Sequence, residues 1–141
     1  MAIRHAFFFL PLAQVKATLM KSLVKLGQVI LYVADMGASV NFYQDCLGLP
    51  VSYPGPDVDL SAEPWVTFET GATSLALHSG GPGNMPADAP SITFMVEDLD
   101  TAYRDVMVHG VKLSEISEPH PGVRLCSGKD PDGHVFILQQ S

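Results

Sequence analysis

Cysteine, basic residues and long apolar runs are all scarce in this sequence of 141 residues. Two cysteines, Cys46 and Cys126, cannot build a disulfide framework. No apolar run reaches the roughly 18 residues that a membrane-spanning helix needs. Charged residues are only 16% of the chain and hydrophobic residues 47%, which excludes a disordered chain and a coiled coil. We therefore expect about one globular domain, large enough to bury a core without disulfides or metal.

Basic residues are unevenly distributed along the chain, and the N-terminal segment holds half of them. The first acidic residue is Asp35, so residues 1–34 carry four basic residues unopposed and a charge of +4. The whole chain carries −7, which leaves −11 on the remainder. A field of that sign repels phosphates, so the sequence excludes nucleic acid as a favoured partner.

The N-terminal segment resembles a secretory leader only in part. Arg4 precedes the apolar residues 6–10, but lysines follow and no small-x-small cleavage site closes the run, so we expect a cytoplasmic protein. After Pro11, apolar residues at helical spacing predict a basic amphipathic helix over residues 11–24: Leu12, Val15, Leu19 and Leu23. Such a stripe usually packs on its own domain or a second subunit, with membrane-surface contact as the alternative. Met20 as the natural start is a further alternative.

An internal repeat organises the rest of the chain. Residues 28–36 match residues 91–99 at an offset of 63 positions. In both copies a β-rich run reaches an aspartate, Asp35 or Asp98, which suits a helix N-cap. Each helical pattern then ends near a glycine, Gly48 or Gly110.

Further strands follow each expected helix. They are predicted at residues 51–53, 65–70 and 74–78 in the first copy, and at residues 113–116, 124–127 and 135–139 in the second. The sequence thus predicts an α+β fold of two βαβββ modules, residues 25–79 and 91–141, joined by a linker at residues 80–90. The modules should form a curved mixed sheet, or half-barrels, with helices on the convex face.

Alternation along the strands predicts which side chains share a face. The uniformly apolar set should pack under the helices: Val29, Leu31, Val33, Ile92, Phe94 and Val96. The mixed set should line the open, concave face: Gln28, Ile30, Tyr32, Trp65, Thr67, Glu69, His78, Ser91, Thr93, Met95, Arg124, Cys126, Val135, Ile137 and Gln139. An apolar face with a few polar groups is typical of a small-molecule site.

These residues resemble the vicinal oxygen chelate superfamily, which includes glyoxalase I, extradiol dioxygenases and bleomycin-resistance proteins. The resemblance covers residues 26–140. It is carried by the first strand with Asp35, by Phe42, Tyr43 and Leu47-Gly48-Leu49, and by Gly122-Val123-Arg124 followed by Asp130-Pro131-Asp132-Gly133. The resemblance implies a two-module fold and a homodimer, which unpaired sheet edges also favour.

Metal enzymes of that family carry ligands on the first and fourth strands of each module. Gln28 matches the first ligand position, but Ala76, Ser91 and Ile137 stand at the others and are poor ligands or none. We therefore expect no metal and no other cofactor. A relocated site using Gln28, His78 and Glu69 is the alternative; His109 is expected at a helix end, and His120 and His134 in turns.

The open face suggests specific roles without deciding them. Arg124 could hold a ligand carboxylate or pair with Glu69 or an acid at the rim of the open face, and the two interpretations carry equal weight. Tyr32 and Trp65 could stack on a planar ligand or fill core. Cys126 with His78 as base, or Glu69 as a general base, would be catalytic arrangements; buried cysteine is commoner.

Three functions follow from these alternatives. The first is a metal-free binding protein for a small, partly aromatic molecule that is anionic if Arg124 faces it. The second is a lyase, isomerase or dioxygenase of the same superfamily with a nonstandard metal site. The third is a regulatory or structural interaction module, and the basic N-terminal segment is the only feature of the sequence that favours it.

Overall fold

The computed structural model describes residues 25–141, so the helix expected at residues 11–24, its membrane contact and the alternative start at Met20 lie outside the described residues. Module one contains β1 (Gln28–Val33), α3 (Met36–Val40), the π-helix η1 (Asn41–Cys46), β2 (Val51–Tyr53), the 3-10 helix η2 (Leu60–Ala62), β3 (Trp65–Phe68) and β4 (Ser74–Ser79). Module two contains β5 (Ile92–Met95), α4 (Leu99–Val108), β6 (Ser117–His120), β7 (Val123–Lys129) and β8 (Val135–Gln140). The α+β fold is as predicted.

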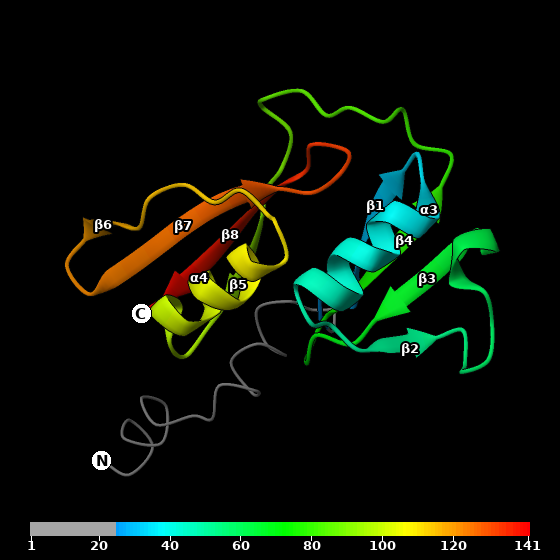
Figure 1. The fold of residues 1–141 in the computed structure, drawn as a ribbon, viewed down its shortest axis with the longest axis horizontal. Helices are drawn as coiled ribbons and strands as arrows, with labels where there is room; N and C mark the ends of the chain where they lie inside the picture. The colour runs from blue at the N-terminus through cyan, green and yellow to red at the C-terminus, as the bar shows by residue number, and fades with distance from the viewer. Residues whose placement is uncertain (1–24) are drawn as a thin grey trace, which may run out of the picture.

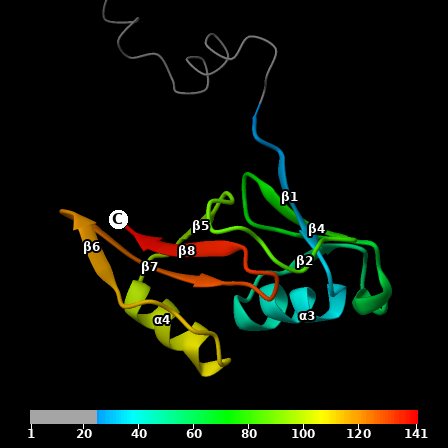
Figure 2. The same cartoon turned by 90° about the horizontal axis from the view of Figure 1, so that it is seen from above.

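The two modules repeat one topology. Module one has the strand order β1-β4-β3-β2, and module two has the matching order β5-β8-β7-β6. The first strand of each is parallel to the last, and the other pairs are antiparallel. The curved mixed sheet of the prediction is therefore two separate four-stranded sheets, since no strand ladder joins them within residues 25–141. Figure 1 shows them side by side, and Figure 2 shows α3 and α4 on the same side of both.

Both predicted N-caps are confirmed. Asp35 Oδ1 accepts a hydrogen bond from the Ala38 amide at 3.0 Å, and Asp98 Oδ1 accepts one from the Thr101 amide at 3.2 Å. Each satisfies an amide that has no partner inside its helix. The helices end before Gly48 and Gly110, whose φ angles of 77° and 83° are easiest for glycine. The local signals in the sequence thus fixed where these helices begin and end.

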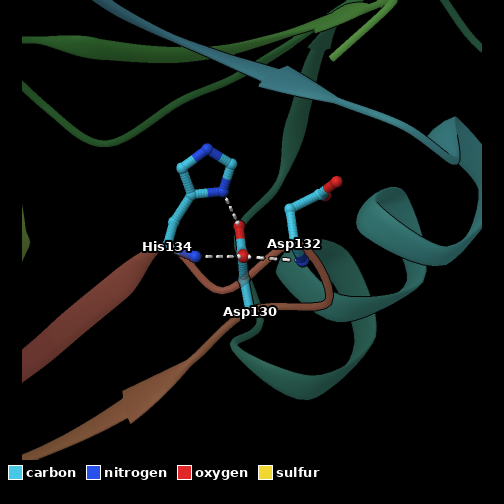
Figure 3. A group of neighbouring side chains, drawn as sticks. All are labelled: Asp130, Asp132 and His134. Carbon is cyan, nitrogen blue, oxygen red and sulfur yellow. Dashed lines mark hydrogen bonds and ion pairs between the residues drawn. The ribbon is translucent and has the colours of Figure 1, made fainter. Parts of the chain in front are cut away.

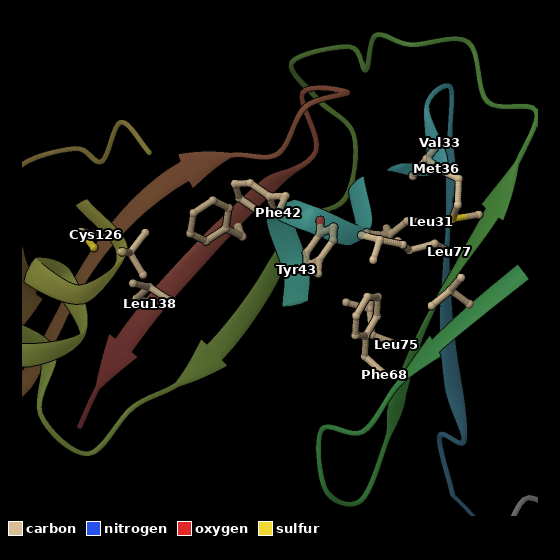
Figure 4. Packing of buried hydrophobic residues seen from close by; sticks show 14 of the residues in the cluster. Leu31, Val33, Met36, Phe42, Tyr43, Phe68, Leu75, Leu77, Cys126 and Leu138 are labelled. Carbon is tan, nitrogen blue, oxygen red and sulfur yellow. The ribbon is translucent and has the colours of Figure 1, made fainter. Parts of the chain in front are cut away.

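A single hydrophobic core spans both modules. Phe42 and Tyr43, adjacent on η1, point to opposite sheets: Phe42 lies 5.6 Å from Phe136 of β8, and Tyr43 lies 6.0 Å from Phe68 of β3, between ring centroids. Figure 4 shows these two rings projecting to either side of the helix. The predicted core residues Leu31 and Val33 are buried, while Ile92, Phe94 and Val96 are half-buried against the same cluster. The helix η1 therefore joins the two modules into one folding unit.

The strand predicted at residues 113–116 is wrong. Leu113 makes only an isolated bridge to Gly128, and the strand that pairs with β7 is β6, four residues further along. Leu113 and Ile116 are half-buried against the core, so their apolar pattern reflects packing rather than pairing. β6 itself is an exposed edge strand containing Pro119, and such a strand carries no alternation of apolar residues.

No helix within residues 25–141 is long and apolar enough to cross a membrane.

Candidate functional site: an aromatic row on an open sheet face

Three aromatic side chains form a row across the open face of module one. Tyr32 of β1 is paired in register with His78 of β4, and His78 is paired with Trp65 of β3. The ring centroids of Tyr32 and His78 lie 5.1 Å apart, and those of Trp65 and His78 lie 5.7 Å apart with the rings nearly perpendicular. We call these three residues the aromatic row. Sequence alternation predicted that all three share this face, and the register confirms that placement.

The aromatic row is open to solvent although it is built from large rings. Tyr32 is 51% exposed, and Trp65 and His78 are half-buried. Trp65 Nε1 donates a hydrogen bond to Thr67 Oγ1 at 2.9 Å, which fixes the orientation of the indole. Exposed rings held in place by their own strand are a suitable surface for a flat ligand, because stacking then orders few new side chains.

His78 is held in one tautomer by the backbone. Its Nδ1 lies 2.6 Å from the carbonyl oxygen of Ser79. A carbonyl oxygen only accepts hydrogen bonds, so Nδ1 carries the proton and Nε2 keeps a lone pair. The described part of the chain offers no hydrogen-bond partner to that second nitrogen. His78 therefore presents an acceptor on the open face.

The family's metal positions do not fit a metal ion here. Ala76 lies on the open face between Ile30 and Thr67 and is fully buried, so it contributes only a methyl group. Ile137 of β8 likewise offers hydrocarbon, and Ser91 offers a neutral hydroxyl just before β5. A divalent metal ion in a protein site needs three or four converging nitrogen, oxygen or sulfur ligands. Neither Ala76 nor Ile137 can supply one.

The relocated site of Gln28, Glu69 and His78 is not assembled either. Gln28 is in register with Ser74, whereas His78 is in register with Tyr32, four residues further along β1. That separation is about 13 Å along the strand. Glu69 follows the end of β3, four residues beyond Trp65, and its carboxylate accepts a hydrogen bond from the Gly71 amide at 3.0 Å. Gln28 and Glu69 therefore lie toward one end of the sheet and the aromatic row toward the other.

One further ring on this face escaped the sequence analysis. Val51 pairs with Phe68 of the core face, but a register irregularity in β2 pairs Tyr53 with Thr67 of the open face. Simple alternation would place Val51 and Tyr53 on the same face. The irregularity reverses that relation, as β-bulges do, and nothing local in the sequence marks it.

The remaining candidates divide between the two faces of module two. Gln139 of β8 pairs with Met95, and Ile137 pairs with Thr93, so both occupy the open face as predicted. Met95 is 62% exposed, and Ser91 is exposed. This second open face is more aliphatic than that of module one.

Arg124 and Cys126 lie on the helix face, and the predicted placement of both is wrong. Cys126 pairs with Leu138 and Arg124 pairs with Gln140, which puts them one residue out of phase with the open-face residues of β8. Cys126 is fully buried, and burial raises the pKa of its thiol. Arg124 binds Asp100 of α4 through both terminal nitrogens, at 3.3 and 3.2 Å. Arg124 thus forms an ion pair, but its partner is Asp100 of α4 rather than Glu69 or an acid at the rim of the open face. Cys126 lies on the face away from His78.

A polar cluster that the sequence analysis did not foresee lies between the modules, although several of its residues carried the family resemblance. Asp130, Asp132 and His134 of the β7–β8 turn are all buried and their ligand atoms lie within 4.8 Å of one another (Figure 3). Asp130 accepts hydrogen bonds from the Tyr43 hydroxyl at 2.6 Å and from His134 Nδ1 at 2.7 Å. We call these residues, with Tyr43 and Ser39, the inter-module lock.

The carboxylate oxygens of the inter-module lock are all hydrogen-bonded within the chain. Asp130 Oδ1 also accepts from the amides of Asp132 and His134, at 3.0 and 2.8 Å. Asp132 accepts from the Ala34 amide at 2.9 Å and from the Ser39 hydroxyl at 3.3 Å. Every carboxylate oxygen is already bonded, so the cluster fastens module two onto α3 and η1 of module one.

Two cavities of about 760 and 970 Å³ lie between the modules. Cys46 and His109 line both, while Tyr32, Trp65 and His78 line neither. Burial, and then Asp45, raise the pKa of the Cys46 thiol, which keeps it protonated and weakly nucleophilic. His109 caps the end of α4, as predicted, and its Nδ1 lies 2.9 Å from the Asp105 carbonyl. These cavities are therefore mainly apolar spaces between helices and sheets.

The repeated βαβββ modules, with helices on one side and open sheet faces on the other, define a class of paired-module proteins. A family model for the Glyoxalase/Bleomycin resistance protein/Dioxygenase superfamily matches residues 25–138. The chain belongs to this superfamily. The resemblance seen in the sequence is thus confirmed.

Known relatives share the fold at low identity. The uncharacterized protein YraH of Bacillus subtilis (strain 168) is 31% identical over 131 residues, covering 82% of this chain and 97% of YraH. Among solved structures, TnmS3, an antibiotic binding protein from Streptomyces sp. CB03234, has a TM-score of 0.68 at 22% identity, covering 84% of this chain and 97% of that one. A mutant of the fosfomycin resistance protein FosX from Listeria monocytogenes, in complex with Mn(II) and 1S,2S-dihydroxypropylphosphonic acid, has a TM-score of 0.70 at 19% identity, covering 84% of this chain and 93% of that one.

Proposed function

We propose that the protein binds a small, planar organic molecule on the open face of module one, without a metal ion. The aromatic row carries this proposal, since Tyr32, His78 and Trp65 are aligned by strand register and left open to solvent. The missing donors at Ala76 and Ile137 support the metal-free part. TnmS3, described as an antibiotic binding protein, shows that a binding role occurs on this fold.

Arg124 does not support an anionic ligand on the open face, because its guanidinium is bound to Asp100 on the helix face. The open-face residues of β1, β3 and β4 include no lysine or arginine. The proposed ligand is therefore aromatic and need not be an acid.

Trp65 provides a direct test, because it is the only tryptophan in the chain. Its single indole N–H resonance can be followed by NMR while the full chain is titrated with 2-naphthol, 2-naphthoate and 2-methoxynaphthalene. At least one of these should shift the resonance saturably, with equal affinity before and after dialysis against EDTA. Saturable binding that disappears with EDTA, or a stoichiometric transition metal in the purified protein, would contradict the metal-free proposal.

The variant Tyr32→Ala should weaken binding by roughly 2- to 12-fold, the amount expected for one aromatic contact. Tyr103→Ala, which removes the same ring from α4 on the helix side, is the matched control and should bind normally. Equal affinity for wild type and Tyr32→Ala would place the ligand elsewhere.

We also propose that the protein is a cytoplasmic homodimer. The outer strands β1 and β5 leave one edge of each sheet unpaired within the described residues, and the nearby side chains of Ile30 and Met95 are exposed. A second copy is the commonest way to cover such edges. Sedimentation at micromolar concentration should show twice the chain mass of 15.2 kDa, and a species of 15.2 kDa would refute the dimer.

A further inference from the structure

We infer that His78 selects the ligand, so that the aromatic row takes a planar molecule carrying a hydroxyl or N–H donor in preference to one carrying an acceptor or an anion. This inference rests on the proposed function and goes one step beyond it. It names the chemical group on the ligand that the protein recognises. It also names the protein atom that accepts the hydrogen bond from that group, Nε2 of His78.

The first step is that His78 cannot change its hydrogen-bonding role at neutral charge. A free imidazole can move its proton between the two nitrogens and so accept or donate at either. Here Nδ1 lies 2.6 Å from the Ser79 carbonyl oxygen, which is an acceptor only. Moving the proton to Nε2 would leave two lone pairs facing each other at that distance. Nε2 is therefore fixed as an acceptor.

The second step is that the ring itself is held in position. Tyr32 lies on one side of His78 and Trp65 on the other, on the two neighbouring strands. Their ring contacts, at 5.1 and 5.7 Å between centroids, limit rotation of the imidazole. A hydrogen-bonding group that is already oriented costs little additional entropy when a ligand binds.

The third step is that no other side chain near the row, within residues 25–141, is restricted to accepting hydrogen bonds. The hydroxyls of Tyr32 and Tyr53 are exposed on this face, but a phenol donates as well as accepts and so does not distinguish a donor from an acceptor. Ala76, the neighbour of His78 on the same face of β4, is a buried methyl group. The hydroxyl of Thr67 is already bonded by the Trp65 indole. Gln28 and Glu69 lie toward the other end of the sheet, about 13 Å away along the strands. Among the described residues of this row, Nε2 is therefore the group that accepts a hydrogen bond without also being able to donate one.

A ligand lying on these rings would meet Nε2 as its edge polar contact. An O–H or N–H donor would form a hydrogen bond there. A methoxy group has no proton to give, and a carboxylate would place an anion against a lone pair. The protein should thus discriminate by the presence of a donor rather than by ring size.

A pair of matched probes tests this inference. 2-Naphthol and 2-methoxynaphthalene share one ring system and differ in the hydroxyl proton. Wild-type protein should bind 2-naphthol about 3- to 10-fold more tightly, as one neutral hydrogen bond allows, and 2-naphthoate should bind more weakly than 2-naphthol. His78→Phe keeps a flat ring of similar size but has no Nε2, so it should bind both neutral probes equally, with the affinity of wild type for 2-methoxynaphthalene retained.

The outcomes separate this inference from the proposed function. If wild type binds 2-methoxynaphthalene and 2-naphthol equally, the face is a binding site but His78 does not select, and the inference is overturned. If neither probe binds, both statements fail together. A preference for 2-naphthol that survives in His78→Phe would assign the selectivity to another group.

The tautomer can be measured without any ligand. Long-range proton–nitrogen NMR spectra of the full chain should show the His78 ring protonated at Nδ1 and bare at Nε2 at a pH where the ring is neutral. A neutral ring protonated at Nε2 would overturn the inference even if the probes bind. Equal melting temperatures of wild type and His78→Phe would show that the variant keeps its fold.

Discussion

His78 lies in β4 and His134 directly precedes β8, the equivalent strand of the other module, yet the two histidines differ in burial and in hydrogen bonding. His134 is buried, and its Nδ1 is bonded to Asp130 inside the inter-module lock. His78 is half-buried, and its Nδ1 is bonded to the backbone while Nε2 faces the open sheet. In the first region the carboxylate oxygens are all partnered from within the chain; in the second a fixed acceptor remains. Burial and satisfied bonding therefore assign the lock to stability, whereas the free acceptor supports the role in recognition that we propose for the aromatic row.

Among the substitutions that test this comparison, Asp130→Ala should cause the largest loss of stability. The substitution removes the common acceptor of Tyr43, His134 and two backbone amides, all of them buried. Removing one partner from such a buried network costs about 3–5 kcal/mol of unfolding free energy. Urea denaturation followed by circular dichroism measures it, and a loss below about 1 kcal/mol would show that the lock does not hold the modules together.

The hydroxyl of Tyr43 should have an intermediate effect that depends on pH. Tyr43→Phe removes one hydrogen bond to a charged acceptor, which costs about 1.5–3 kcal/mol at pH 7. Burial, and then the adjacent Asp130 carboxylate, raise the pKa of Tyr43 far above its ordinary value of 10. The folded state therefore keeps the Tyr43 proton above pH 10, where the unfolded chain releases it.

The sign follows from linkage. Because the folded-state pKa is raised, the stabilisation is fully present below about pH 10 and is lost as the pH rises further, by about 1.4 kcal/mol for each pH unit. The stability difference between wild type and Tyr43→Phe should hence be constant from pH 7 to 9 and shrink between pH 10 and 11. A difference that stays constant to pH 11 would mean that Tyr43 is not protected from ionisation.

The smallest effect is expected from Arg124→Ala. The ion pair with Asp100 is solvent-exposed, with the two side chains 32% and 57% exposed, and such pairs contribute little to stability. The melting temperature should fall less than in Tyr43→Phe, and the affinity for each naphthalene probe should stay at the wild-type value. A selective loss of 2-naphthoate binding would restore Arg124 to the ligand site.

Much of each module could be predicted from short stretches of sequence. Asp35 and Asp98 cap their helices, and the apolar alternation of Leu31 and Val33 identifies the buried face of β1. These features depend on residues within one turn or one strand, where side-chain period and backbone hydrogen bonding leave few alternatives. The aromatic row also followed from alternation, because β1, β3 and β4 are regular at those positions.

By itself, then, the sequence determined the repeated βαβββ plan, the helix starts and the open-face position of Tyr32, Trp65 and His78. Only the tertiary structure decided the phase of β7, which places Arg124 against α4, and the irregularity of β2, which turns Tyr53 onto the open face. It alone also decided the inter-module lock, whose hydrogen bonds join residues 87 to 98 positions apart. Register and long-range bonding depend on which chain segments meet in space, and no local period in the sequence records that.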